Sequence, residues 1–278
     1  LYEWFNPLYK NNPDQYVSQH MLPQLKDLVT RYQPELIYPD GEWEQPSSVW
    51  QSENFLSWLY NESPVKETVV VNDRWGKETR GVHGGFYSSE YGIKAGDTKA
   101  SELAAHPWEE IRGIGTSFGY NRVENLNNYL SSGELVHLLI TIVANGGNLC
   151  LNIGPKPDGT IPVIMQQRLT DIGNWLKVNG EAIYGTSTWK DMPKAQQGQT
   201  VFYTAKGNDL FVLTTKWQAE KLIVPGIKNF KKVSLLGSSL PVKARLKNGL
   251  LTLQPPSINP SNNPCKDAWV FKIEGAFK

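Results

Sequence analysis

Helical and extended patterns alternate through residues 1–189, and this alternation constrains the fold more than any other feature of the 278-residue chain. Apolar residues recur at helical spacing in the stretches 14–32 (interrupted near Pro23), 52–61, 132–144 and 162–179. Short apolar runs typical of strands lie at 36–38, 68–71 and 148–153, and residues 111–120 are expected to form a strand broken by glycines and a turn. Alternating strands and helices predict a parallel α/β barrel or sheet, with 68–71 as a buried strand and 77–107 as a long loop.

The pattern changes after Trp189. Short runs with strand character now follow one another closely, separated by turn signals such as Asn248-Gly249. They lie at 200–206, 210–217, 222–224, 233–236, 242–246, 250–253 and 268–273. Strands of this length and spacing predict a small β-sandwich. We therefore expect two domains, an α/β domain at 1–189 and a β-sandwich at 190–278.

Charge and composition exclude several classes of partner and cofactor. The chain has 28 basic and 27 acidic residues and a net charge of +1, which gives no general attraction to nucleic acid or anionic membranes. No apolar run approaches the roughly 18 residues that a membrane span needs. The histidines lack metal-ligand spacing and the two cysteines are too few for a metal cluster, so we expect no metal and no cofactor. Cys150 lies in an apolar run and is expected to be buried.

Polar clusters follow three of the predicted strands. In a (β/α) barrel the C-terminal ends of the strands meet at the active-site mouth, so side chains that follow different strands converge there. The clusters are Asp40 with Glu42 and Trp43, Asn72 to Trp75, and Phe118 to Arg122. The segment after the second cluster adds His83, Tyr87, Glu90, Tyr91, Trp108, Glu109 and Glu110. Taken alone, Asp40-Gly41 is also an ordinary turn sequence.

Carboxylates, an arginine and aromatic side chains at one mouth favour glycoside hydrolysis. The reaction needs two carboxyl groups that flank the anomeric carbon, one ionised and the other protonated near neutral pH. A nearby arginine favours the charged form of the nucleophile, and a dry aromatic wall favours the protonated form of the acid. Ten Trp and twelve Tyr suit a sugar-binding protein, although buried aromatics would account for them as well. The sequence has no nucleophile elbow, Walker loop or dinucleotide fingerprint.

Several motifs occur in a fixed order along the chain: Asp40 to Glu44, Asn54 to Lys66, Val69 to Gly76, Ser117 to Arg122, Gly146 to Pro155 and Gly180 to Tyr184. Together they resemble the retaining α-L-fucosidases of glycoside hydrolase family 29. The resemblance implies a TIM-type (β/α) barrel, of which only the later strands are present, followed by a C-terminal β-sandwich. The family's pattern has a further N-terminal portion with a His-His pair, so this chain is expected to begin inside the barrel.

The resemblance also implies roles for individual residues. Asp40 stands where the family has its nucleophile, and the segment Ser88-Ser-Glu-Tyr91 puts the acid/base at Glu90. The pair Trp108-Glu109 makes Glu109 the alternative acid/base. In a retaining enzyme the two carboxyl groups would lie roughly 5–5.5 Å apart. The implied substrate-binding residues are Arg74, Trp43, Phe118, His83 and Tyr38.

Several of the polar and aromatic residues also have a structural interpretation. Arg74 would form an ion pair with Asp73, and Phe118 would pack in the core. Glu109 and Glu110 would be a charged pair on a solvated loop. His137 lies in an apolar helical stretch and is expected to be structural.

Two functions of different class stay open. The first is a retaining exo-α-L-fucosidase that removes terminal fucose from oligosaccharides or glycoproteins by double displacement. The second is a non-catalytic, fucosidase-like carbohydrate-binding protein. The intact candidate carboxylates favour the first. The family implies a secretory route (periplasmic, extracellular or lysosomal), and a homo-oligomer stays open.

Overall fold

The structure, a computed structural model, describes residues 9, 12–191, 193 and 196–277. The chain divides into two compact units, which we describe separately. Unit 1 comprises residues 1–88 with 106–108, and unit 2 comprises residues 89–105 with 109–278.

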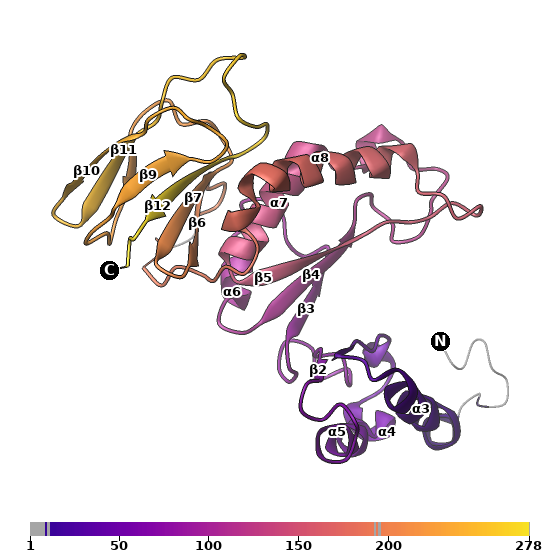
Figure 1. The fold of residues 1–278 in the computed structure, drawn as a ribbon. Helices are drawn as coiled ribbons and strands as arrows, with labels where there is room; N and C mark the ends of the chain where they lie inside the picture. Colours follow the sequence, from indigo (N-terminus) through magenta and orange to yellow (C-terminus); the bar gives the residue numbers. More distant parts are fainter. Residues whose placement is uncertain (1–8, 10–11, 192, 194–195, 278) are drawn as a thin grey trace. The chain divides into compact units, whose positions relative to one another are not determined.

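Unit 1 consists of helices packed on a short parallel strand pair (Figure 1). In chain order its elements are α2 (Pro13–Tyr16), the π-helical turn η2 (Val17–Met21), α3 (Leu22–Tyr32), β1 (Leu36–Ile37), the 3₁₀ turn η3 (Glu42–Glu44), α4 (Ser47–Trp50), α5 (Ser52–Asn61) and β2 (Val70–Val71). The predicted interruption of the first helix is confirmed as the π-helical turn immediately before Pro23. The second predicted helix has the expected bounds.

The core of unit 1 lies between the strand pair and helices α3 and α5. Its buried members are Val29, Ile37, Phe55, Leu59, Val65, Val69, Val71 and Trp75. The strands pair in parallel, as predicted, with Leu36 opposite Val70 and Ile37 opposite Val71. The prediction that 68–71 is a buried strand is wrong for Val70, which is 48% exposed. Alternate residues of a strand point to opposite faces, and within unit 1 the helices cover only one of them.

The first sheet of unit 2 has the strand order β3-β4-β5. These strands are Tyr87–Glu90, Trp108–Gly113 and Gly147–Asn152, and the division between the two units passes through the first two. The prediction of a structureless loop at 77–107 is wrong, because this segment contains β3 and the short helix α6 (Lys99–Leu103). The strand predicted at 111–120 also begins earlier, at Trp108.

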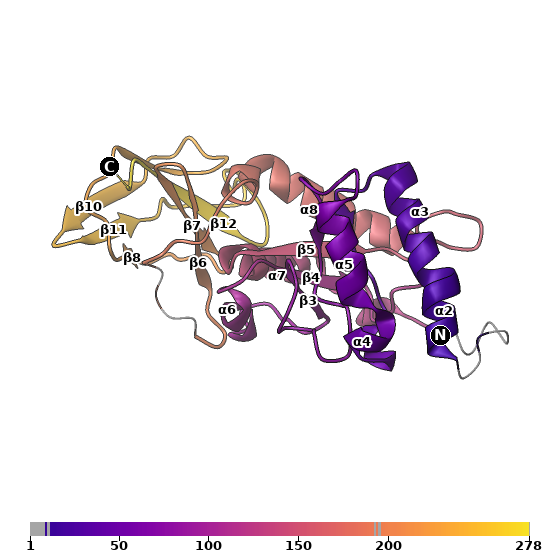
Figure 2. The ribbon, with the colours of Figure 1, turned by 90° about the horizontal axis from the view of Figure 1, so that it is seen from below.

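Helices α7 (Ser132–Ala144) and α8 (Val163–Asn179) confirm the predicted bounds to within one residue. They pack side by side in Figures 1 and 2. A capping box begins α7, since the Ser131 hydroxyl accepts from the Glu134 N–H and the Glu134 carboxylate accepts from the Ser131 N–H. The 3₁₀ turns η4 (Leu126–Asn128) and η5 (Gly180–Ala182) lie in the connections.

The C-terminal part contains the predicted antiparallel strands in two sheets, ordered β6-β7-β12-β9 and β10-β11-β8. Their bounds are β6 (Val201–Lys206), β7 (Asp209–Thr214), β8 (Leu222–Val224), β9 (Lys232–Leu235), β10 (Lys243–Lys247), β11 (Leu250–Gln254) and β12 (Trp269–Glu274). Leu210 and Val212 of β7 join the core shared by the two sheets. Phe211 and Leu213 join the core shared with α7 and α8. Burial on both faces accounts for the continuous apolar run of β7.

Two further predictions from the sequence concern Cys150 and His137. Cys150 is exposed, so its prediction as a buried thiol is wrong. It lies on β5, where alternate side chains point to opposite faces and an apolar run does not bury every member. His137 is partly buried, and its Nε2 lies 2.7 Å from the carbonyl oxygen of Asp267. Across the described residues, no helix is both long and apolar enough to cross a membrane.

Candidate active site

The candidate site centres on an ion pair at the ends of the two parallel strands of unit 1. Asp40 follows β1 and Arg74 follows β2, and parallel strands present their C-terminal ends at one edge. Arg74 Nη1 lies 2.7 Å from Asp40 Oδ1. The Arg74 side chain is fully buried, whereas that of Asp40 is 59% exposed. The buried cation therefore holds a carboxylate that is still open to solvent or ligand.

Two further contacts fix the guanidinium of Arg74. Its Nε donates a hydrogen bond to Ser88 Oγ at 2.8 Å. Its central carbon lies 5.0 Å from the centre of the Tyr38 ring, a cation–π arrangement. Tyr38 in turn packs against Phe86, with 6.3 Å between the ring centres. The structure thus brings together three predicted site residues: Asp40, Arg74 and Tyr38.

Asp73 does not take the role given to it by the structural interpretation of Arg74. Its Oδ1 accepts hydrogen bonds from the backbone N–H and the hydroxyl of Ser88, at 3.1 and 2.6 Å. Its Oδ2 accepts from the Gly81 N–H at 2.8 Å. Asp73 is fully buried. The carboxylate of Asp73 thus anchors the segment 81–88, and Arg74 pairs with Asp40.

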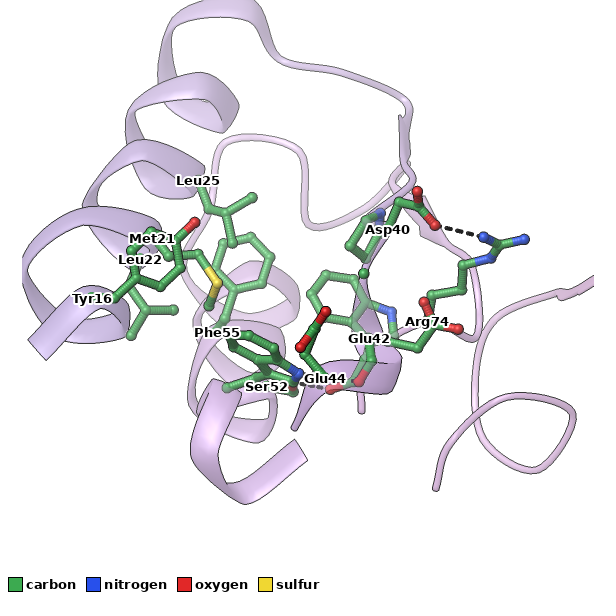
Figure 3. Close-up of a pocket in the computed structure, with 14 residues that line it drawn as sticks. Tyr16, Met21, Leu22, Leu25, Asp40, Glu42, Glu44, Ser52, Phe55 and Arg74 are labelled. Atoms are coloured by element: carbon green, nitrogen blue, oxygen red, sulfur yellow. Dashed lines mark hydrogen bonds and ion pairs between the residues drawn. The ribbon is translucent and has the colours of Figure 1, made fainter. Parts of the chain in front are cut away.

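A pocket opens beside the ion pair (Figure 3). Its apolar wall comes from the first helices, and Figure 3 shows that wall on one side and the Asp40–Arg74 pair on the other. The lining residues are Tyr16, Met21, Leu22, Leu25, Pro39, Asp40, Gly41, Glu42, Glu44, Trp50, Ser52, Phe55, Arg74 and Trp75. An apolar hollow with a few convergent polar groups is the usual form of a small-molecule site.

Glu42 is the second carboxylate of this pocket, and it is buried. Its Oε1 lies 3.7 Å from Arg80 Nη1, and its Oε2 has no hydrogen-bond partner within the described part of the chain. Trp43, the next residue, is 52% exposed and is not part of the pocket wall. His83 is exposed and lines a different hollow, together with Glu78 and Thr79. The structure therefore does not bring Trp43 or His83 to the Asp40 pocket.

The two acid/base candidates differ in environment. Glu90 ends β3 and is exposed. Glu109 is half-buried on β4, and this burial raises its pKa. Burial also raises the pKa of Glu110, although hydrogen bonds from Ser89 and Ile93 act in the opposite direction. The structural interpretation of Glu109 and Glu110 as a charged pair on a solvated loop is wrong, because both lie in a strand and Glu110 is fully buried.

Strand alternation puts both candidates on one face of the sheet. Tyr87 N–H donates to the Pro107 carbonyl and Tyr91 N–H to that of Ile111, a parallel register that places Ser89 opposite Glu110 on one face. Their chain neighbours Glu90 and Glu109 then leave the sheet on the opposite face. Phe118, another predicted site residue, is 39% exposed and meets Tyr91 edge to face, with ring centres 5.0 Å apart. Phe118 is thus not a core residue.

Sequence reasoning missed the roles of Ser88, Asp73 and Glu110. Ser88 and Glu110 lie in strands whose bounds were not predicted, and their partners are distant along the chain. The sequence signal for such residues was a single polar side chain within an extended segment, and this signal is a weak indication of a functional role. The described residues contain no group of three or more His, Cys, Asp or Glu side chains that could hold a metal ion.

Two family models match the chain. The family model described as Alpha-L-fucosidase matches residues 1–181, and the one described as Alpha-L-fucosidase C-terminal domain matches residues 194–274. An alpha-L-fucosidase of Dictyostelium discoideum is 42% identical over 98% of the chain and 61% of its own length. The human tissue alpha-L-fucosidase is 39% identical over 99% of the chain and 60% of its own length.

The structure also resembles solved fucosidases. The Thermotoga maritima alpha-fucosidase in complex with fucose superposes with a TM-score of 0.71 and 29% identity, covering 96% of this chain and 59% of that one. The same protein in complex with a mechanism-based inhibitor has a TM-score of 0.69, covering 93% of this chain and 56% of that one. The chain therefore spans about three fifths of the length of the relatives it matches.

Proposed function

Because the chain belongs to the alpha-L-fucosidase family, we propose that the protein hydrolyses terminal α-L-fucose from oligosaccharides or glycoproteins. The observation that carries this proposal is the 2.7 Å contact between the buried Arg74 guanidinium and the exposed Asp40 carboxylate. It places a carboxylate against a buried cation at the edge of a pocket, which suits a glycosidase nucleophile.

The nucleophile in this proposal is Asp40. Arg74 holds its Oδ1, whereas its Oδ2 accepts no hydrogen bond from the residues that the structure describes. Oδ2 would attack the anomeric carbon while the glycosidic C–O bond breaks and the acid/base protonates the departing oxygen, which gives a β-linked fucosyl-enzyme. Water, deprotonated by the same acid/base residue, would then displace Asp40 and release α-fucose. Arg74 would also contact the sugar, and Tyr38 and Phe118 are proposed as further substrate contacts, whereas Trp43 and His83 do not line the Asp40 pocket.

The proposed acid/base is Glu90, with Glu109 as the alternative. Glu90 is favoured by its motif, and Glu109 by its environment, since a general acid must keep its proton near neutral pH and burial raises the pKa of Glu109. Their shared face of the sheet is compatible with either assignment. The separation of roughly 5–5.5 Å between Asp40 and the acid/base stays a prediction.

We also propose the finer architecture. The strands β1 and β2 would be neighbours in a TIM-type (β/α) barrel, since they pair in parallel and each is followed by a candidate site residue. The boundary between barrel and β-sandwich would lie at 189/190, between the two segments that the family models match. The protein would follow a secretory route, and the relatives named tissue and plasma alpha-L-fucosidase are compatible with it.

The test is the stereochemistry of hydrolysis by the full-length protein. Proton NMR of early product from an aryl α-L-fucoside should show α-fucose first, followed by slow mutarotation. Asp40→Gly should lower the rate by on the order of 10⁴, while Glu42→Gln should keep most of it. β-Fucose as the first product would contradict the retaining mechanism. Binding of fucose without turnover would favour the non-catalytic alternative.

A further inference from the structure

We propose that Ser88 is a positioning residue, which acts on the reaction by fixing the Arg74 guanidinium against Asp40. This inference rests on the proposed function. Ser88 itself is 9% exposed and no contact of its side chain with Asp40 is required. Its hydroxyl instead connects two charged groups, the carboxylate of Asp73 and the guanidinium of Arg74.

The donor and the acceptor in the two hydrogen bonds of the Ser88 hydroxyl can be assigned in only one way. A carboxylate only accepts, and a guanidinium N–H only donates. The Ser88 hydroxyl must therefore give its single hydrogen to Asp73 Oδ1, at 2.6 Å, and offer a lone pair to Arg74 Nε, at 2.8 Å. A side chain at this position must both donate and accept, and alanine can do neither.

Ser88 is itself held in place. Its backbone N–H donates to the same Asp73 oxygen at 3.1 Å, while the other oxygen of Asp73 accepts from Gly81. The segment 81–88 can approach Asp73 closely because Gly84 has no side chain. A Cβ atom there would come within 2.6 Å of the Asp73 Cα atom. The acceptor for Arg74 is therefore preorganised rather than recruited on binding.

The Ser88 hydroxyl therefore determines how the Arg74 guanidinium is oriented. A long arginine side chain with one contact could rotate and present different nitrogen atoms. Ser88 fixes Nε, the Tyr38 ring covers one face, and Nη1 then points at Asp40. Loss of the Ser88 hydroxyl would leave the charge of Arg74 in place but loosen the geometry in which it meets the nucleophile. A displacement of about 1 Å in an active site costs on the order of 100-fold in rate.

The experiment compares Ser88→Ala with Ser88→Thr and the adjacent control Ser89→Ala in the full-length protein. Ser89 is the next residue of β3, so its side chain projects from the opposite face of the strand to that of Ser88. Two rates are measured: turnover of an aryl fucoside and covalent labelling by a 2-fluoro-fucoside. We expect Ser88→Ala to lower both rates by the same factor, on the order of 10- to 100-fold. Ser88→Thr, which keeps the hydroxyl, should restore most of the loss, and Ser89→Ala should stay within about twofold.

A double-mutant cycle separates positioning from a general effect on the fold. If Ser88 acts through Arg74, Ser88→Ala should have little further effect in an Arg74→Lys background, since lysine has no Nε–H to anchor. An equal loss in both backgrounds would overturn the proposal, as would labelling of Ser88→Ala at the wild-type rate. Failure of the proposed function would give a different result. If the Asp40→Gly variant kept the activity of the enzyme, Asp40 would not be the nucleophile, regardless of the effect of Ser88→Ala.

Discussion

Arg74 and Asp40 lie 34 residues apart in the sequence, yet Arg74 Nη1 and Asp40 Oδ1 are 2.7 Å apart. The arginine side chain is wholly buried and the aspartate side chain is mostly exposed. A buried cation is costly unless it is paired, so the contact with Asp40 offsets part of the cost of burying Arg74. Arg74 therefore belongs both to the buried part of unit 1 and to the candidate site at the end of the strand pair.

Arg74→Lys should lower turnover of an aryl fucoside by on the order of 100-fold or more. Lysine keeps the charge, but it cannot contact Ser88 and Asp40 through a rigid planar fork or stack on Tyr38 in the same way. Steady-state kinetics of the full-length protein would measure this loss. The control is Arg31→Lys, because Arg31 pairs with Asp27 at the same 2.7 Å but on an exposed helix surface. Similar kinetics for the two variants would contradict a special role for Arg74.

Glu90→Ala should reduce hydrolysis of natural fucosyl glycans far more than hydrolysis of aryl fucosides with good leaving groups, which need less protonation. Azide should partly rescue this variant and give the α-azide, since azide displaces Asp40 from the β-linked fucosyl-enzyme with inversion and needs no general base. Glu109→Ala is tested in parallel. Rescue of Glu109→Ala alone would transfer the acid/base role to Glu109.

Glu110 should make stability depend on pH with a definite sign. Burial raises its pKa in the folded state, so the fold favours the protonated carboxyl. Relative to Glu110→Gln, the wild-type protein should be most stable at or below the ordinary carboxyl value of 4.5 and lose stability as the pH rises through the raised pKa. Urea unfolding between about pH 4 and pH 8 measures the difference in unfolding free energy.

Glu134 provides the control of opposite sign for this titration. Hydrogen bonds from Ser131 lower its pKa, so its contribution is present above 4.5 and lost as the pH falls. The wild-type protein should therefore gain stability relative to Glu134→Gln as the pH rises towards 4.5, so this pair is also measured below about pH 4. A difference for Glu110→Gln that has the same sign as that for Glu134→Gln would disprove the burial argument.

Two leucines of β11 test the core of the β-sandwich. Leu253 is fully buried between the sheets, whereas Leu250, in the same strand, is 46% exposed. Leu253→Ala should cost about 2–5 kcal/mol of unfolding free energy through lost contacts and a cavity. Leu250→Ala should cost less than about 1 kcal/mol. Chemical denaturation would measure both, and equal costs would contradict the assignment of the strand faces.

The sequence predicted those parts of the fold and site that depend on local patterns. Apolar periodicity and the capping box gave α5, α7 and α8 to within a residue, because these signals lie within each helix. Asp40 was found because a polar cluster directly follows an apolar strand. The alternation of helices and strands also predicted that the first strand pair would be parallel.

The rest depends on contacts that no local pattern encodes. The β3 segment Tyr87-Ser-Ser-Glu90 has no apolar run, and it is a strand only because it pairs with β4. In the sequence, Glu110 looks like one member of a solvated charged pair. In the folded chain it is buried and accepts a hydrogen bond from the backbone N–H of Ile93, 17 residues away. Ser88 is undistinguished in sequence, and only the folded chain brings it between Asp73 and Arg74.

The most direct test of the account is covalent trapping of the nucleophile. The full-length protein is incubated with a 2-fluoro-α-L-fucoside that carries a good leaving group, and the labelled peptide is sequenced by mass spectrometry. We expect one fluorofucosyl group on the carboxylate of Asp40, and no label in Asp40→Gly. A label on Glu42 or Glu44, or an unlabelled but fully active enzyme, would contradict it.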